Sequence, residues 1–146
     1  MNTELGSKWH GFMKVVLIIN GIIGMLLGII TMFGGTWFLY TDYSASEIYR
    51  FFPGFQILDV IYGIITCLIA IAYFYVYSKL KNLKTGAPKM LFILYIVECA
   101  VGLIYALILS AGLGGSVVNW TGIIGSAATA FINKAYYDKR EAWFVN

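Results

Sequence analysis

Four long apolar runs, separated by shorter polar connections, dominate the hydropathy pattern of this chain. They cover about residues 15–34, 55–77, 90–111 and 117–136. Each run has about 20 residues, the length with which an α-helix crosses the hydrocarbon core of a bilayer. The pattern predicts the all-α fold of a polytopic membrane protein, in which four transmembrane helices form a single antiparallel bundle over residues 1–146.

The segments beside these runs mix aromatic and charged residues, a pattern typical of the membrane interface. The interfacial segments predicted in this way are residues 5–14, 44–52 and 137–146. In the second of them, Ser44 precedes Glu47 in the spacing of a capping box, which predicts the start of a short helix that ends at Pro53. His10, the single histidine of the chain, lies in the first segment and is expected to contact lipid headgroups.

Charged residues are scarce, and the positive ones lie mostly on one side of the predicted bundle. They make up 12% of the chain, compared with ~25% in soluble domains. Nine of the ten Lys and Arg residues fall in the N-terminal segment, the 79–89 connection and the C-terminal segment, whereas the opposite side has only Arg50. Because positive residues favour the cytoplasmic side, we expect a multi-pass protein of the cell membrane with both termini in the cytoplasm.

The 79–89 connection is rich in lysine. Its lysines are Lys79, Lys81, Lys84 and Lys89. Each basic residue near an anionic leaflet adds ~1 kcal/mol of attraction, so these side chains are candidate contacts for lipid headgroups, although the topology alone already explains their position. Topology also explains the net charge of +3 without a nucleic-acid partner. The expected partners are the lipid bilayer and either a second copy of the chain or another membrane protein.

One acidic residue, Glu98, lies in the middle of an apolar run. A charged side chain at the centre of a membrane helix costs ~2.5–3.5 kcal/mol on insertion scales, so a compensating environment is expected. Every fourth residue after it is small: Gly102, Ala106 and Ser110. Small residues let a second helix approach closely, so this face is predicted to point into the bundle and away from lipid.

The first two runs have small faces as well. Gly24 and Gly28 form a Gly-x-x-x-Gly pair in the first run, and Gly63 and Ala70 lie near one face of the second, together with Asp59. Such spacings are common where membrane helices pack against each other.

Estimated depths place the polar residues of the four runs in two layers. From a rise of ~1.5 Å per residue, the inner layer lies roughly 4–5 Å to the cytoplasmic side of the membrane centre, and the outer layer roughly 12 Å to the other side. The inner layer contains Asn20, Glu98 and Thr129, and the outer layer contains Thr31, Asp59, Ser110 and Asn119. Polar groups in lipid need partners on neighbouring helices, so Glu98 is predicted to hydrogen-bond with Asn20, with Thr129 as a further candidate. Asp59, nearer to the headgroups, is expected to reach water.

The sequence contains no pattern that predicts catalysis. We find no Ser/His/Asp or Cys/His set, no spacing for a metal and no cofactor motif, so the chain is not expected to be an enzyme. The glycine-rich stretch 112–116 lacks the strand and the Lys-Ser/Thr of a phosphate-binding loop and is predicted to be a turn. The two cysteines, Cys67 and Cys99, lie in separate runs and are expected to be buried apolar side chains.

Two functions are compatible with this pattern. The first is a non-catalytic accessory, assembly or interaction subunit that acts through helix–helix contacts with other membrane proteins. The second is a small oligomeric transporter or channel in which Glu98 binds a proton or another cation, since ionisable residues in spans often mark pathways. A dry, filled interior would favour the first function, whereas a water path past Asn20 and Glu98 would favour the second.

Overall fold

The computed structural model describes residues 5–145, and all regular secondary structure in this range is helical. The elements, in chain order, are α1 (Ser7–Met32), η1 (Trp37–Leu39), α2 (Ala45–Phe51), α3 (Pro53–Lys81), α4 (Ala87–Leu113), α5 (Trp120–Asp138) and η2 (Glu141–Trp143), where η denotes a short 3-10 helix. The predicted all-α fold is thus confirmed for the described residues.

The helix boundaries follow the capping, proline and glycine signals of the sequence. The capping box predicted at the start of α2 is present: Ser44 Oγ accepts a hydrogen bond from the Glu47 N–H (3.4 Å), and Glu47 Oε2 accepts one from the Ser44 N–H (2.8 Å). Pro53 occupies the first turn of α3, where a backbone N–H has no helical partner to lose. α4 is terminated by Gly114, whose φ of 70° suits glycine, and this is the turn predicted from the glycine-rich stretch.

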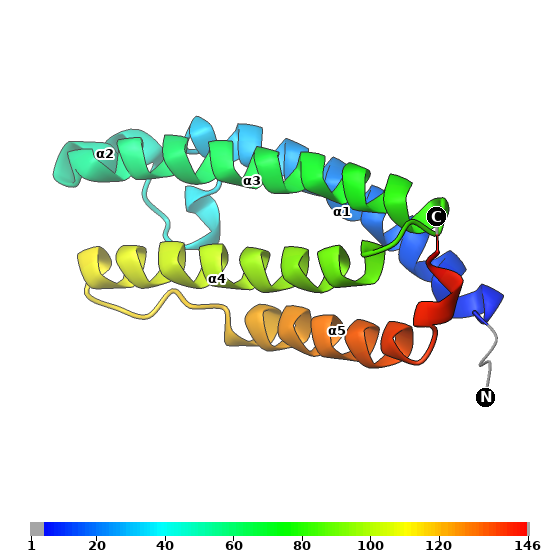
Figure 1. Ribbon diagram of the computed structural model, residues 1–146. Coiled ribbons are helices and arrows are strands. Elements are labelled where there is room, and N and C mark those ends of the chain that lie inside the picture. The colour runs from blue at the N-terminus through cyan, green and yellow to red at the C-terminus, as the bar shows by residue number, and fades with distance from the viewer. Residues whose placement is uncertain (1–4, 146) are drawn as a thin grey trace.

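The long helices run antiparallel and side by side (Figure 1). α1 packs along α3 in the most extensive contact between two helices, and α4 packs along α5 and, less extensively, along α3. Both ends of the described chain and the α3–α4 connection lie at one end of the molecule, which we call the terminal end. α2 and the α4–α5 connection lie at the opposite end, which we call the far end.

Glycines explain why α1 and α3 approach so closely. A Cβ atom on Gly63 would lie 2.5 Å from the Gly28 carbonyl oxygen, and one on Gly28 would lie 2.6 Å from Cys67 Sγ. Both distances are far below ordinary van der Waals contact, so the helices can meet here only if these two residues lack a side chain. Gly24 lies against Ala70 in the same interface. The small faces predicted on the first two runs therefore form this contact.

Two buried clusters occupy the two ends of the bundle. The cluster at the terminal end includes Met13, Leu17, Tyr73, Leu91, Tyr95 and Tyr137. The cluster at the far end contains Trp37, Ile48, Phe55, Tyr105 and Leu109. Between them, the middle of the bundle holds cavities that are lined in part by polar side chains.

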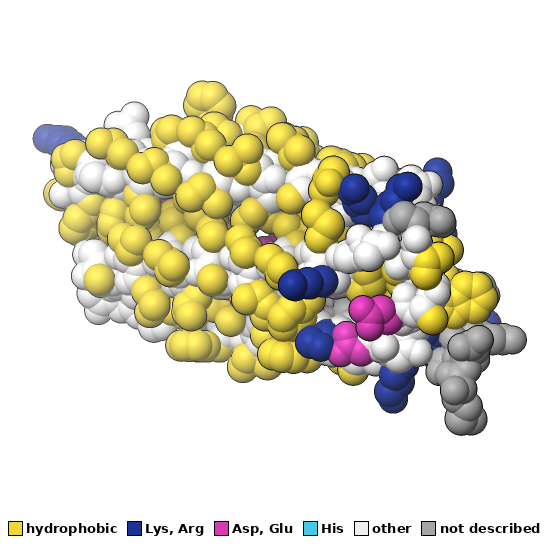
Figure 2. Space-filling model, viewed as in Figure 1, with side chains coloured by type: hydrophobic (Ala, Val, Ile, Leu, Met, Phe, Trp, Pro, Cys, Tyr) yellow, Lys and Arg dark blue, Asp and Glu magenta, His cyan; other side chains and the backbone are white. Residues whose placement is uncertain are grey.

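Three helices are long and apolar enough to cross a membrane, by length and composition. They span Lys8–Met32, Pro53–Lys81 and Ala87–Leu113, and large exposed apolar side chains such as Ile57 and Leu68 cover their outer faces. Figure 2 shows this apolar surface along the helices and a gathering of Lys and Arg side chains toward the terminal end. These properties indicate a multi-pass membrane protein.

The fourth predicted run, residues 117–136, differs from the other three. Its helix, α5, begins only at Trp120, because Asn119 caps the first turn, and residues 117–119 belong to the connection. α5 has 19 residues, and several of them are polar. Unlike the three helices of the described chain named above, it does not meet the criterion of length and apolar composition for a membrane span. The structure therefore supports three of the four predicted spans directly.

Candidate functional site

Glu98, on α4, accepts a hydrogen bond from a tyrosine of α3. The Tyr73 hydroxyl donates to Glu98 Oε2 over 2.5 Å, and Tyr73 itself is 1% exposed. This differs from the predicted arrangement, in which Asn20 or Thr129 would bond to Glu98. The Thr129 hydroxyl instead donates to a carbonyl of its own helix (2.8 Å), as helical threonines often do. Asn20 lies beside the tyrosine hydroxyls of Tyr73 and Tyr95.

A cavity of about 340 Å³ lies beside Glu98, and we call it the Asn20 cavity. Its lining includes Asn20, Thr31, Thr36, Tyr40, Tyr62, Thr66, Tyr95, Glu98 and Ser126. Tyr95 is 3% exposed, and its hydroxyl lies next to Asn20, although no hydrogen bond of ordinary geometry joins the two side chains. Asn20 and Glu98 thus border one polar space, although they are not bonded to each other.

A second cavity, of about 360 Å³, adjoins the first between α4 and α5, and we call it the Gly102 cavity. The two cavities share Tyr40, Tyr62, Glu98 and Ser126 in their linings. The face of α4 that was predicted to receive another helix lines this space instead, and a Cβ atom on Gly102 would meet no atom within 4 Å. The space stays open because the facing positions of α5, Gly122 and Ser126, are small as well.

Asp59, on α3, accepts hydrogen bonds from three aromatic side chains at the far end. Its Oδ2 accepts from Trp37 Nε1 (2.8 Å) and the Tyr49 hydroxyl (2.6 Å), and its Oδ1 accepts from the Tyr105 hydroxyl (2.7 Å). Asp59 is 0% exposed, so the expectation that it reaches water is wrong. The reason is tertiary, because the segment 33–52 folds back and brings two of the three donors to it.

Burial, reinforced by the hydrogen bond to Asp59, raises the pKa of Tyr49 to about 12. Tyr49 therefore keeps its proton at neutral pH and remains a hydrogen-bond donor. The sequence pattern did not predict Trp37, Tyr49 and Tyr105 as partners of this carboxyl group. The sequence does show an acidic residue in an apolar run, and it contains several Trp and Tyr residues that can donate hydrogen bonds. Which of these side chains reach Asp59 depends on how three separate elements, η1, α2 and α4, are placed around it.

The other members of the predicted outer layer are satisfied locally. Thr31 and Ser110 each donate to the carbonyl four residues earlier in their own helix, over 2.7 Å in both cases. Asn119 accepts a hydrogen bond from the Gly122 N–H (3.0 Å) and caps α5. Within the described structure these side chains bond neither to Asp59 nor to one another, so the predicted layer is not a shared network.

An aromatic cluster that the sequence analysis missed joins α1 to α5 at the terminal end. Trp9 Nε1 donates to Asn133 Oδ1 (3.1 Å), and His10 Nδ1 lies 3.2 Å from the Tyr137 hydroxyl. His10 is only 6% exposed, so the expectation that it contacts lipid headgroups is wrong. Helix α1 begins at Ser7, before this residue, and its geometry turns the imidazole toward α5.

The lysines of the α3–α4 connection lie at the terminal end. Lys79 Nζ is 5.3 Å from the centre of the Tyr75 ring, a cation–π contact. Lys81, Lys84 and Lys89 are exposed. Their contact with lipid headgroups stays a prediction.

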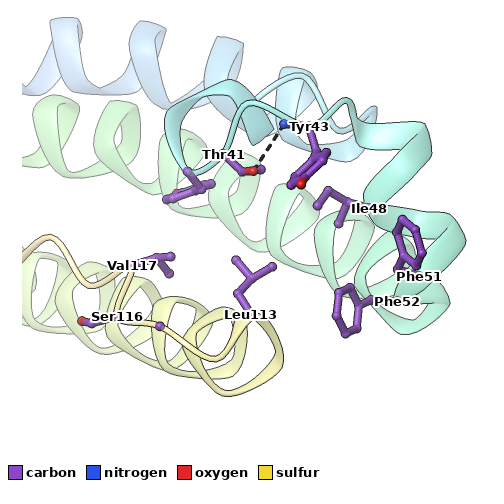
Figure 3. A pocket seen from close by; sticks show the side chains of 10 residues that line it. Thr41, Tyr43, Ile48, Phe51, Phe52, Leu113, Ser116 and Val117 are labelled. Carbon is purple, nitrogen blue, oxygen red and sulfur yellow. Dashed lines mark hydrogen bonds between the residues drawn. The ribbon is translucent and has the colours of Figure 1, made fainter.

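A separate, largely apolar pocket of about 540 Å³ opens at the far end (Figure 3). Phe52, next to α2, lies across it from Leu113 and Val117 of the α4–α5 region. On another part of its wall, the Tyr43 N–H donates to Thr41 Oγ1 (3.3 Å). No charged side chain lines this pocket in the described structure, so it offers shape and apolar surface rather than reactive groups.

Two further findings complete the description of the site. Among the described residues, no three His, Cys, Asp or Glu side chains gather as the ligands of a metal ion would. Comparisons of the chain with protein-family models, with curated proteins and with solved structures each give no match.

Proposed function

We propose that this protein crosses the cell membrane four times, with both termini in the cytoplasm. The 19 residues of α5 would span about 28 Å, close to the ~30 Å thickness of the hydrocarbon core. Nine of the ten Lys and Arg residues belong to the segments of the terminal end, and this asymmetry supports a cytoplasmic location for that end.

Within this topology, the proposed function is that of a small transporter or channel in which Glu98 binds a proton or another monovalent cation. The observation that carries the proposal is the pair of adjoining cavities at Glu98, of about 340 and 360 Å³. A glutamate that only fastened two helices together would need no such space beside it. The polar lining, which includes Asn20, Thr66 and Ser126, favours a hydrated interior.

The test is ion flux in liposomes that contain the purified protein and a pH-sensitive dye. With a potassium diffusion potential that draws protons inward, the wild-type protein should acidify the interior. Glu98→Gln should lower the initial rate by about tenfold or more, while circular dichroism shows unchanged helix content. Glu141→Gln is the matched control, because Glu141 is an exposed carboxyl group at the terminal end, away from the cavities.

Liposomes with a potassium gradient, a potassium-sensitive dye and no potassium ionophore extend the test to a second cation. Proton and potassium fluxes that are the same for wild-type protein, Glu98→Gln and empty liposomes would overturn the proposed function.

The second candidate function is an accessory or assembly subunit that docks through helix–helix contacts. The observation that favours it is an exposed small-residue face on α5. Gly125 and Ala128 are both exposed, and a Cβ atom on Gly125 would meet no atom within 4 Å. Small residues on the outer face of a membrane helix are typical of a surface that receives another helix.

This candidate is tested by the mass of the protein in lipid nanodiscs, measured by light scattering. If the face joins two copies, the wild-type protein is dimeric or larger and Gly125→Leu is monomeric. Ile124→Phe adds bulk at the neighbouring exposed position and should leave the mass unchanged. A monomeric wild-type protein would remove self-association from this candidate function.

A further inference from the structure

The cavities at Glu98 are lined by a single acidic side chain. Of all the described residues that line the Asn20 and Gly102 cavities, Glu98 alone is ionisable to a carboxylate, and no Lys, Arg or His lines either space. Its Oε2 accepts the Tyr73 hydroxyl, and within the described structure no donor bonds to Oε1. A charge of one sign, in a site of low dielectric without a counter-ion from the protein, selects a ligand of the opposite sign.

Four tyrosines contribute to the remaining wall. Tyr40, Tyr62, Tyr95 and Tyr105 all line one or both cavities. Tyr62 and Tyr105 stack with ring centroids 3.8 Å apart and an interplanar angle of 9°. Aromatic faces attract cations, and they do so most strongly when the cation is poorly hydrated, as an alkylated ammonium group is.

The size and the ligand set of the site favour an organic cation over a divalent metal ion. Each cavity exceeds 300 Å³, which is the lower range for sites that enclose a small organic molecule. Divalent cations such as Ca²⁺ take six to eight oxygen ligands in a close shell, usually with carboxylates among them. The described residues contain no such group of acidic side chains.

The polar lining of the Asn20 cavity includes Asn20, Thr66 and Ser126, whose side chains can bond to a hydroxyl group of the ligand or to water around it. From the single carboxyl group, the aromatic walls and the volume, we infer that the Glu98 cavities bind an organic ammonium cation.

The inferred ligand class rests on the proposed function, because both assign cation binding to Glu98. In the bound state, the ammonium group lies against the Glu98 carboxylate and the face of Tyr62, and the rest of the molecule occupies the Gly102 cavity. A larger side chain at position 102 would project into this cavity, because no protein atom lies within 4 Å of a Cβ atom there. It would therefore occupy the space assigned to the ligand.

The experiment is isothermal titration calorimetry of the full chain in dodecyl maltoside micelles. The probe is choline, and the control ligand is 3,3-dimethyl-1-butanol, which has the same shape with a neutral carbon in place of the charged nitrogen. We expect choline to bind at one site per chain, and the neutral isostere to bind about tenfold more weakly or not at all.

Three variants locate the binding. Glu98→Gln should weaken choline binding by about tenfold or more, and Tyr62→Leu by about 2- to 30-fold, the range expected for one cation–π contact. Glu141→Gln should bind choline as the wild-type protein does. Circular dichroism and the thermal midpoint of each variant establish that it is folded before its binding is compared.

The outcomes separate this inference from the proposed function. Equal binding of choline and its neutral isostere, or full choline binding by folded Glu98→Gln, would overturn the inferred ligand class. If choline does not bind but Glu98-dependent proton or potassium flux is present, the ligand class is wrong and the proposed function stands. If choline binds through Glu98 but liposomes show no cation flux, the ligand class stands and the transport function fails.

Discussion

The two carboxyl groups inside this bundle have opposite surroundings, since Asp59 is buried and Glu98 is half-buried. Asp59 is 0% exposed, and its two oxygens accept hydrogen bonds from Trp37, Tyr49 and Tyr105. Glu98 accepts one hydrogen bond, from Tyr73, and borders two cavities. The same chemical group is therefore enclosed by protein at the far end and left beside open space in the middle of the bundle.

This difference teaches how to distinguish a structural acid from a candidate ligand site. Three donors from three elements occupy the acceptor sites of Asp59 and tie η1 and α2 to the membrane helices α3 and α4. Glu98 retains an oxygen without a protein partner, together with the volume for a molecule beside it. Acids whose bonds are all made within the protein stabilise a fold, whereas acids with free bonding capacity and space can bind something else.

The largest effect is expected for Asp59→Asn. The amide has one acceptor oxygen where the carboxylate has two, so at least one of the three donors loses its acceptor or must rotate, and the other bonds lose the assistance of charge. We expect a loss of about 3 kcal/mol in the free energy of unfolding. Titration with SDS in mixed micelles, followed by circular dichroism, measures it. A loss below about 1 kcal/mol would contradict the structural role of Asp59.

A smaller loss is expected for Gly63→Ala in the α1–α3 contact. The added methyl group would lie 2.5 Å from the Gly28 carbonyl oxygen, which belongs to a rigid backbone. Overpacking of this kind costs about 2 kcal/mol. The matched control is Gly102→Ala, which meets no atom within 4 Å and should instead stabilise its helix by up to about 1 kcal/mol. The same SDS titration measures both, and equal effects would show that the two halves of the bundle are packed alike.

Glu98→Gln should change the free energy of unfolding by less than about 1 kcal/mol. The amide can still accept the Tyr73 hydroxyl, and single hydrogen bonds in membrane proteins contribute about 0.6 kcal/mol on average. Compared with Asp59→Asn, this is the same chemical change at the half-buried acid, so the two values together quantify the contrast. A loss as large as that of Asp59→Asn would assign Glu98 a structural role and weaken the proposed function.

The smallest effect concerns the exposed capping box of α2. Hydrogen bonds from the Ser44 hydroxyl and N–H to Glu47 lower the pKa of Glu47 below its usual value of about 4.5. A lowered pKa in the folded state means that this stabilisation is present above about pH 4.5 and is lost as the pH falls through the lowered pKa. Hydrogen exchange of the α2 amides, compared with that of Glu47→Gln at each pH, should show a step in the wild-type protein alone. Identical pH profiles of hydrogen exchange for the wild-type protein and Glu47→Gln would contradict this stabilising role of Glu47.

The sequence allowed part of the candidate site to be predicted. Glu98 was identified because a carboxyl group in an apolar run is costly and therefore rare. Its neighbour Asn20 was placed at the same depth, and both residues do line one cavity. Tyr73 and Tyr95 were not selected, because a tyrosine in a membrane run is common and its rotation about the helix axis determines whether its hydroxyl meets an acid or lipid.

The predicted layers were based only on depth along each helix. Depth indicates which polar residues lie at the same level, but it does not indicate which of them form hydrogen bonds with each other. Thr129 and Ser110 have hydroxyls at suitable depths, yet both donate to carbonyls of their own helices. Asp59 was expected to reach water, because the sequence does not indicate that segment 33–52 folds back over it. The small face of α4 was expected to receive a helix, because spacing does not reveal that the facing residues of α5 are small too.

The helical class, the long apolar helices, the capping box of α2 and the turn at Gly114 follow from the amino-acid sequence alone, because they depend on composition and on contacts between near neighbours in the chain. Which acid is enclosed and which borders a cavity is set by the folded arrangement of the helices. That choice depends on the rotation of each helix about its axis and on the position of the far-end segment, and both are set by packing between residues distant in the chain.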